Sequence, residues 1–258
     1  MTTCLIGYTG FVGSTLLRNT TFDDLYNTKN ADDIREKHYD LVVCAAAPAV
    51  KWKANQNPEE DLLNIRTIME NLKTITATKF VLVSTVDVYK TPIDVNEDTP
   101  INPDEVSPYG RHRYYLEQFV EDNFPNYLIV RLPGLFGEGL KKNFIYDLIH
   151  TNCLHLTHRD SNFQFYNMEF LWNDIMKALD LNLSLVNFVV EPVSAKEIAD
   201  KAMNESFENT TESLPVYYDM RSKYSHFFNN GSRGNYFKDK EQILSEIQAY
   251  IEKERATL

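Results

Sequence analysis

The chain has 258 residues, 43% of them apolar, and a formal net charge of −11. This length suits one large domain or a domain with a smaller lobe, and the acidic charge argues against nucleic acid or an anionic membrane surface as a partner. The N-terminus lacks a basic stretch followed by a long apolar one, and no uncharged apolar run is long enough to cross a bilayer, so we expect neither a signal peptide nor a membrane span. The three cysteines lack metal-type spacing; we expect reduced thiols, no metal site and a cytoplasmic location.

The N-terminal stretch predicts a strand, a tight turn and a helix. Residues 4–6 form a short apolar run, and Gly7, Gly10 and Gly13 follow at the spacing GxxGxxG. Gly7 permits a sharp turn, Gly10 lets the backbone approach a pyrophosphate, and Gly13 lets the helix pack closely on the sheet. The helix N-terminus then offers amide groups and a positive dipole end to the phosphates. We therefore favour a dinucleotide-binding loop over a simple packing turn.

A second strand is expected near Leu25 and Tyr26, although its pattern is weak. In dinucleotide-binding folds the residue after this strand contacts the adenosine ribose. Asn27 is able to hydrogen-bond a ribose hydroxyl, and Lys29 is able to pair with a 2′-phosphate, which would favour NADP. The other interpretation is a solvated loop, so the choice between NAD and NADP stays open.

Strands then alternate with helices. Buried strands are predicted at residues 39–47, 79–85 and 127–132, with helices at 59–74 and 109–123 and a loop between residues 48 and 58. This alternation predicts an α/β fold with a doubly wound parallel sheet of the Rossmann type. Residues 1–132 are expected to form the dinucleotide-binding domain, and residues 133–258 mainly a small substrate-binding lobe from which some segments return to the sheet.

The C-terminal part has shorter predicted elements. We expect a helix at residues 143–150, a strand at 187–190, and a final amphipathic helix at 240–255. Ser194 and Glu197 have the spacing of a capping box for a helix that starts at Ala195.

Three side chains suggest acid–base chemistry. Thr85 ends a predicted strand, and Tyr109 and Arg113 lie four residues apart on one face of a predicted helix. A tyrosine has a reference pKa of about 10. A nearby fixed cation favours the phenolate, so we expect Arg113 to lower the pKa of Tyr109.

Several motifs resemble the extended short-chain dehydrogenase/reductase superfamily, in particular its nucleotide-sugar epimerase/dehydratase group. The resemblance runs nearly from end to end through the segments GYTGFVG, VVCAAAP, NIRT, VSTVDVY, SPYGRHR, RLPGLFGEG and EPVSAKEIA. It implies NAD or NADP as cofactor, Tyr109 as general acid/base and Thr85 as its partner. The cofactor-binding residues that it implies or that the loop predicts are Gly7, Thr9, Gly10, Phe11, Val12, Gly13, Asn27, Ala46, Ala47, Asn64, Ser84, Tyr109, Arg113 and Pro133.

Two departures from the family pattern matter. The family's helix carries a lysine that also bonds the nicotinamide ribose, and here Arg113 holds that position. Arginine keeps the charge but is planar and bulky, which puts catalysis in doubt more than cofactor binding. Members that eliminate water often carry Asp-Glu directly after the threonine, where this chain has Val86 and Asp87. An epimerase or a reductase is therefore favoured over a 4,6-dehydratase.

Substrate contacts are weaker predictions. Asp87 is a candidate extra acid/base, Lys142 and Asn143 follow a glycine turn where the family contacts a diphosphate, and Arg221 and Arg233 are candidate phosphate ligands. For each of them an exposed, solvated side chain is the alternative.

We therefore expect an NAD(P)-dependent oxidoreductase or epimerase that acts on a nucleotide-sugar by hydride transfer at a carbinol or keto carbon. A non-catalytic NAD(P)-binding sensor or scaffold of the same fold is the alternative. A helix-pair homodimer near Tyr114 is also implied by the resemblance.

Overall fold

The computed structural model describes residues 1–203, 206–229 and 234–256. The chain divides into two compact units, each assembled from three segments. Unit 1 comprises Met1–Lys90, Thr99–Arg131 and Glu169–Val186, and unit 2 comprises Thr91–Asp98, Leu132–Met168 and Asn187–Leu258.

Unit 1 is built on a six-stranded sheet in the order β10-β6-β4-β3-β1-β2. The strands are β1 (Thr3–Ile6), β2 (Asp24–Tyr26), β3 (His38–Cys44), β4 (Thr76–Thr85), β6 (Tyr127–Leu132) and β10 (Leu185–Asn187). Strand β1 pairs in parallel with β2 and β3, and β3 pairs in parallel with β4. The chain order reverses beside β1, which is the switch point where ligands bind in such sheets. The predicted parallel Rossmann-type sheet, including its weakly patterned second strand, is confirmed.

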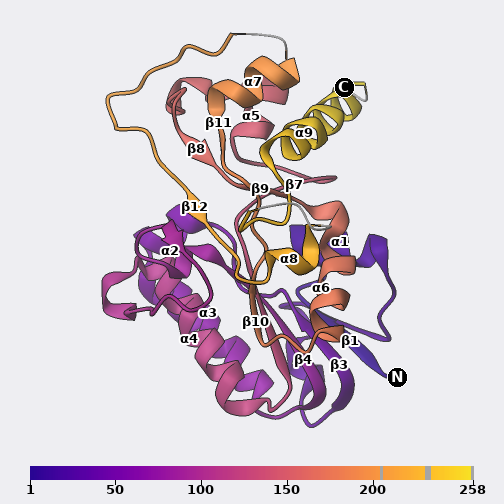
Figure 1. Ribbon diagram of the computed structural model, residues 1–258. Coiled ribbons are helices and arrows are strands. Elements are labelled where there is room, and N and C mark those ends of the chain that lie inside the picture. The colour runs from indigo at the N-terminus through magenta and orange to yellow at the C-terminus, as the bar shows by residue number, and fades with distance from the viewer. Residues whose placement is uncertain (204–205, 230–233, 257–258) are drawn as a thin grey trace. The chain divides into compact units, whose positions relative to one another are not determined.

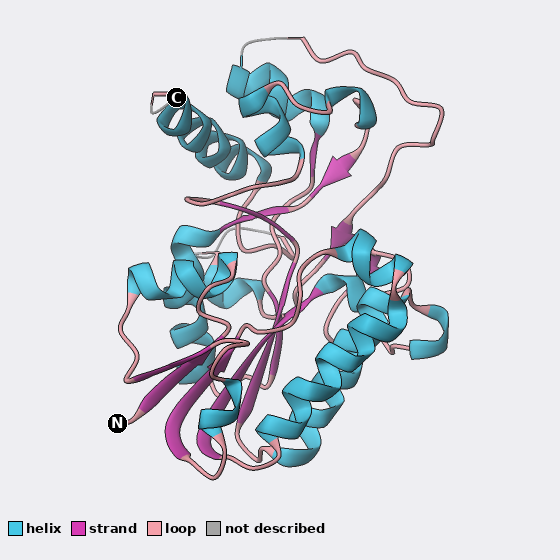
Figure 2. Cartoon of the chain, turned by 180° about the vertical axis from the view of Figure 1, so that it is seen from behind, coloured by secondary structure: helices cyan, strands magenta, loops and turns pink. Residues whose placement is uncertain are grey.

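Helices cover both faces of this sheet, as the two opposite views show (Figure 1, Figure 2). They are α1 (Phe11–Asn19), α3 (Pro58–Leu72), α4 (Pro108–Asn123) and α6 (Leu171–Asp180), while the short α2 (Lys51–Gln56) packs on α3 and α4. In Figure 1, α3 and α4 lie on one face and α1 and α6 on the other. Proline stands at the first helical position of α3 and of α4, where a missing N–H costs nothing.

The core of unit 1 follows the predicted apolar patterns. Ile65 and Leu72 of α3 and Leu116 and Val120 of α4 are at most 1% exposed and pack on the sheet. Fully burying such an aliphatic side chain contributes about 1.5–3 kcal/mol. These contacts hold α4 against β4, so the start of α4 lies near the C-terminal end of that strand.

Unit 2 contains short elements. Its strands are β5 (Ile93–Val95), β7 (Gly134–Phe136), β8 (Asn162–Phe163), β9 (Phe165–Asn167), β11 (Val193–Ser194) and β12 (Asp219–Met220), and its helices are α5 (Phe144–His150), α7 (Ala195–Met203), α8 (Ser225–Phe228) and α9 (Lys240–Arg255). The pairs β11–β8, β12–β5 and β7–β9 each form a two-stranded sheet. The capping box of α7 is confirmed, since the Ser194 amide donates to Glu197 at 2.8 Å and the Glu197 amide donates to the Ser194 hydroxyl at 3.1 Å.

Two local predictions are wrong, and one helix was not predicted. The loop expected between residues 48 and 58 contains α2, and α6 was not expected. The strand expected at residues 187–190 ends at Asn187. Phe188, Val189 and Val190 are fully buried outside a strand, so their apolar character reflects side-chain packing.

No helix of the described residues is long and apolar enough to cross a bilayer.

Candidate active site

The glycine loop joins β1 to α1 at the switch point of the sheet. Gly7 has a φ of +89°, which favours glycine, and a Cβ there would lie 2.5 Å from the carbonyl oxygen of Ala45. A Cβ on Gly13 would lie 2.2 Å from the carbonyl oxygen of Gly7. Both glycines are therefore required by backbone packing. A Cβ on Gly10 would meet one described atom within 4 Å, the Gly7 carbonyl oxygen at 3.4 Å, so space remains beside this residue.

The N-terminus of α1 is suited to an anion. Gly10 is the N-cap residue, and no side chain caps this end of the helix. The backbone amides of the first turn and the positive end of the helix dipole therefore lie next to the exposed Gly10 backbone. Of the other predicted loop residues, Thr9 is exposed and Phe11 and Val12 are half-buried. A loop where Cβ atoms are excluded, followed by an uncapped helix, fits a pyrophosphate.

Asn27 lies at the end of β2, where a ribose contact was predicted. Its side-chain oxygen accepts a hydrogen bond from the Lys29 amide at 2.8 Å, and its own amide donates to the Asn30 side chain at 2.8 Å. Asn27 thus shapes a tight turn, and Lys29 is exposed. This geometry leaves the preference between NAD and NADP open.

Other predicted cofactor residues lie along the same edge of the sheet. Ala46 and Ala47 follow β3 and are half-buried, and Asn64 is exposed on α3. The Ser84 hydroxyl is directed elsewhere, because it donates to Glu117 at 2.5 Å. Glu117 is also the partner of Arg131 in a buried ion pair at 2.6 Å, so Ser84 belongs to a polar network inside unit 1.

The structure brings Thr85 and Tyr109 to the same end of unit 1, since α4 packs on β4 and on the 3-10 helix Val86–Val88. The Thr85 hydroxyl accepts a bond from the Asp87 amide at 3.1 Å, and a hydroxyl that accepts is still able to donate its own hydrogen. The contact is very close at Gly110, where a Cβ would lie 1.9 Å from the Asp87 carbonyl oxygen. Gly110 therefore lets the start of α4 touch the chain after β4.

Arg113 stacks on the ring of Tyr109 and forms an ion pair with Asp61. Its guanidinium carbon is 4.0 Å from the centre of the Tyr109 ring. The guanidinium donates to both carboxylate oxygens of Asp61, at 2.5 and 2.8 Å, and to the carbonyl oxygen of Pro48 at 2.5 Å. Arg113 is 2% exposed and Asp61 is 4% exposed. The positive charge is thus neutralised inside unit 1.

The ionisation of Tyr109 reflects this arrangement. Burial raises the pKa of Tyr109, and Asp87 and Asp61 raise it further, whereas Arg113 and Lys51 lower it. Arg113 lowers the pKa of Tyr109, as expected, but the net shift is upward because burial is the larger effect. Burial of the phenol outweighs the effect of a cation that already has an anionic partner.

Helix α2 lies over these residues. The Asn55 side-chain oxygen accepts a hydrogen bond from the Tyr109 amide at 3.0 Å. One turn earlier on the same helix, Lys51 forms an ion pair with Asp87 at 2.6 Å. A segment that was expected to be a loop therefore places a cation and an amide beside the start of α4.

The remaining predicted residues lie in unit 2, where Pro133 precedes β7. Burial lowers the pKa of Lys142. The Asn143 side chain caps α5 by accepting from the amides of Ile145 and Tyr146 at 3.0 and 3.2 Å. Arg221 forms ion pairs with Asp94 and Asp219. Arg233 lies outside the described residues.

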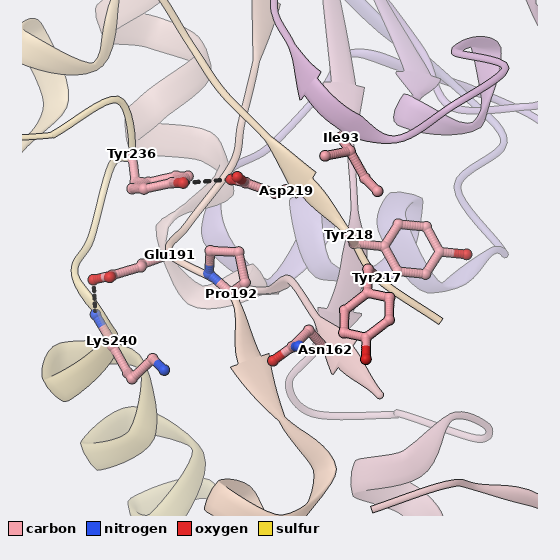
Figure 3. A pocket seen from close by; sticks show the side chains of 9 residues that line it. All are labelled: Ile93, Asn162, Glu191, Pro192, Tyr217, Tyr218, Asp219, Tyr236 and Lys240. Carbon is pink, nitrogen blue, oxygen red and sulfur yellow. Dashed lines mark hydrogen bonds between the residues drawn. The ribbon is translucent and has the colours of Figure 1, made fainter. Parts of the chain in front are cut away.

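Unit 2 also contains a pocket of about 450 Å³ (Figure 3). Its polar groups are largely anchored: the Tyr236 hydroxyl donates to Asp219, the Lys240 amide donates to Glu191 at 2.8 Å, and the Lys240 ammonium pairs with Glu197 at 2.7 Å. The residues that line the pocket are Ile93, Asn162, Glu191, Pro192, Tyr217, Tyr218, Asp219, Tyr236 and Lys240. Aromatic rings with carboxylate and amide groups suit a sugar or a base.

The described part of the chain contains no cluster of three or more His, Cys, Asp or Glu side chains that could hold a metal ion. Cys4 and Cys44 are buried as free thiols, and Cys153 is exposed.

Sequence reasoning missed Lys51, Asn55 and Asp61. Asp61 left a signal, because it lies four residues before the buried Ile65 on the apolar face of α3. A carboxylate at such a position needs a buried partner. Lys51 and Asn55 left no comparable signal.

The sequence matches the profile of the NAD dependent epimerase/dehydratase family over residues 19–161. A search of curated protein sequences found no match.

Solved structures with a similar fold include enzymes of several activities. The dTDP-4-dehydrorhamnose reductase of Clostridium acetobutylicum is 17% identical, with a TM-score of 0.73 over 99% of this chain and 100% of that one. The UDP-N-acetylglucosamine 4-epimerase of Methanobrevibacter ruminantium, solved with UDP-N-acetylmuramic acid, is 14% identical, with a TM-score of 0.73 over 100% and 99%. RMD of Pseudomonas aeruginosa, solved with NADPH, is 15% identical, with a TM-score of 0.74 over 100% of both chains. At these identities the likeness establishes the fold.

Proposed function

The chain belongs to the NAD dependent epimerase/dehydratase family, and on that premise we propose that it is an NAD(P)-dependent oxidoreductase or epimerase of a nucleotide-sugar. The observation that carries the proposal is the pairing of an uncapped, glycine-lined helix N-terminus with Thr85 and Tyr109 at the same edge of one parallel sheet. In such sheets this edge is where the cofactor binds and where the chemistry takes place.

The loop residues are proposed to hold the dinucleotide. The first-turn amides of α1 would bind the pyrophosphate beside Gly10, with Gly7 and Gly13 keeping the backbone close. Ala46 and Ala47 leave room next to the loop, since their side chains are small. When it is bound, NAD or NADP supplies the acceptor or donor of a hydride.

Tyr109 and Thr85 are proposed to handle the proton. As a sugar carbinol is oxidised, the Tyr109 oxygen takes up the hydroxyl proton, and it returns a proton when a ketone is reduced. The Thr85 hydroxyl donates a hydrogen bond to the same sugar oxygen. Burial raises the pKa of Tyr109, so the neutral phenol is its favoured form.

The pocket of unit 2 is proposed to bind a sugar or a base. Tyr217 is 49% exposed there, and its ring offers a face for a sugar or a base. Glu191 and Asp219 accept hydrogen bonds from hydroxyl groups. Solved structures of this fold in complex with UDP-N-acetylmuramic acid or with UDP-glucuronic acid and NAD support this class of substrate. A cytoplasmic location and a homodimer remain predictions.

Ligand binding tests the proposal first. Thermal unfolding is measured with NAD, NADP and a panel of nucleotide-sugars, because a ligand that binds the native state at 100 times its Kd adds about 2.7 kcal/mol. We expect one dinucleotide and one class of nucleotide-sugar to raise the Tm. With the substrate found, Tyr109→Phe is expected to lower turnover by about 10²–10⁴-fold while dinucleotide affinity stays close to that of the wild type. Unchanged turnover removes Tyr109 from the chemistry.

One observation favours the second candidate function, an NAD(P)-binding sensor without turnover. Arg113, which stands where the family's lysine bonds the nicotinamide ribose, is neutralised by Asp61 and 2% exposed. A sensor would bind the dinucleotide in the Tm assay yet convert no nucleotide-sugar. Appearance of activity in Arg113→Lys, absent from the parent, would support the sensor.

A further inference from the structure

A buried polar network of unit 1 lies at the C-terminal end of β4. Its centre is the ion pair of Glu117 on α4 with Arg131 on β6, whose side chains are 2% and 4% exposed. The guanidinium donates to both carboxylate oxygens, at 2.6 and 3.1 Å. The Ser84 hydroxyl donates to Glu117 at 2.5 Å, and Arg131 donates to the Tyr89 hydroxyl at 2.8 Å. Ser84 and Tyr89 are buried as well, so these bonds are shielded from water.

The two hydroxyl bonds hold both ends of the segment 84–89. Ser84 directly precedes Thr85, the last residue of β4. Successive side chains of a strand point to opposite faces, so a bond that holds Ser84 also limits the directions that the Thr85 side chain is able to take. Tyr89 ends the short 3-10 helix that follows β4. Between these two ends, the Asp87 amide donates to the Thr85 hydroxyl at 3.1 Å.

The ion pair joins this segment to the helix that carries Tyr109. Glu117 follows Tyr109 by two steps of four residues, so both side chains lie on one face of α4. The start of α4 also touches the segment, because a Cβ on Gly110 would lie 1.9 Å from the Asp87 carbonyl oxygen. One network is therefore bonded to both elements that carry the residues proposed to handle the proton.

A buried ion pair often stabilises a fold no more than apolar side chains of similar volume would, because removing two charges from water costs about as much as their pairing contributes. Its bonds are directional, however, and a bidentate contact fixes the orientation of both partners. Resting on the proposed function, we propose that the ion pair of Glu117 with Arg131 positions Thr85 for the reaction. Both members are buried positioning residues that act through the hydroxyls of Ser84 and Tyr89.

The first experiment removes the two hydroxyls and leaves the ion pair in place. Ser84→Ala/Tyr89→Phe deletes both hydrogen bonds between the pair and the segment, and amide hydrogen exchange measured by NMR reports how firmly the segment is held. We expect the Asp87 amide to exchange about 10–100 times faster than in the wild type, which is the factor that corresponds to the loss of a hydrogen bond to a charged group.

Tyr39→Phe is the matched control. It also deletes a buried tyrosine hydroxyl that donates to a carboxylate, that of Asp24 at 2.5 Å. Tyr39 is the second residue of β3, so it lies at the edge of the parallel sheet opposite to Thr85. The exchange of the Asp87 amide is expected to stay at the wild-type rate in this variant.

Turnover is the second readout. With a substrate in hand, Ser84→Ala/Tyr89→Phe is expected to lower kcat about 10–100-fold with little change in KM, since a displacement of about 1 Å near the reacting atoms has an effect of this order. A loss of stability alone does not lower kcat while the protein stays folded, so Tyr39→Phe is expected to keep kcat. Glu117→Leu/Arg131→Met strands no charge, and it is expected to combine a Tm near that of the wild type with faster exchange and lower kcat.

Equal exchange of the Asp87 amide in Ser84→Ala/Tyr89→Phe and Tyr39→Phe overturns the inference, and this comparison needs neither dinucleotide nor sugar. Faster exchange with an unchanged kcat also overturns it, because the network then holds the segment without a consequence for the reaction. Faster exchange together with a lower kcat supports it. If exchange rises as expected but the wild type converts no nucleotide-sugar, the hold of the network on the segment is established and the proposed function fails.

Discussion

Asp61→Ala tests how much the buried ion pair of Asp61 with Arg113 contributes to the free energy of unfolding. The substitution leaves the Arg113 guanidinium buried, 2% exposed, with its bidentate partner gone, and it removes the partner of His112 at 2.8 Å. Removing one member of a buried ion pair costs about 3–5 kcal/mol. For a protein of this size that loss corresponds to a decrease in Tm of about 6–20 °C.

The assay is urea or thermal unfolding of Asp61→Ala against the wild type. Glu60→Ala is the matched control, because Glu60 is the neighbouring acid on α3 but its pair with Lys53 is exposed, and such pairs contribute at most about 1 kcal/mol. Asp61→Ala combined with Arg113→Met removes the stranded charge and is expected to recover part of the loss. If Asp61→Ala is as stable as Glu60→Ala, the pair does not have the structural role assigned to it.

The same pair predicts a pH dependence. Burial raises the pKa of Asp61, but the bonds from Arg113 and His112 outweigh burial, and the net shift is downward. A carboxyl whose pKa is lower in the folded state stabilises that state above the unfolded value of about 3.9. The contribution is lost as the pH falls below about 4, so the difference in stability between the wild type and Asp61→Ala is expected to shrink there. A difference that is constant from pH 7 to pH 3 would contradict the assigned shift.

Two further predictions concern the glycine loop and the thiols. Gly13→Ala places a Cβ against the Gly7 backbone and is expected to lower the Tm. Gly10→Ala makes one contact of 3.4 Å, so it is expected to keep the Tm but to weaken NADH binding, measured by NADH fluorescence. If the two variants have the same Tm and the same NADH affinity, the pyrophosphate site is refuted. Burial raises the pKa of Cys44 to about 11 and raises that of Cys4 further. A thiol reagent such as DTNB is therefore expected to react quickly with the exposed Cys153 in the native protein, and with Cys4 and Cys44 after unfolding.

The sheet and its long helices were predictable because their patterns are local. Buried strands are continuous apolar runs, and α3, α4 and α9 have regular spacings that end within two residues of the predicted limits. Helix α2 was not predicted because it is six residues long and has one buried residue, Ala54, while its Trp52 is 65% exposed. Helix α6 had a usable signal in its buried Leu171, Ile175 and Leu179, which follow helical spacing.

The site was predictable as a set of residue types but not as a set of contacts. Tyr109 and Arg113 share a helix face, as expected, yet the partner that decides the role of Arg113 is Asp61, 52 residues earlier in the sequence. Asn143 was predicted as a substrate contact, and its side-chain oxygen is used as a helix cap. Long-range pairing of this kind depends on how α3 packs against α4, which the spacing of either helix alone does not specify.

The central claim is that a dinucleotide binds at the first turn of α1 and that Tyr109 acts beside it. A crystal structure of the protein grown with NADH or NADPH tests this most directly. We expect density for the pyrophosphate against the amides that follow Gly10, and the nicotinamide ring within reach of the Tyr109 oxygen. Dinucleotide density at another site, or a Tyr109 ring directed away from the bound nicotinamide, would contradict the account.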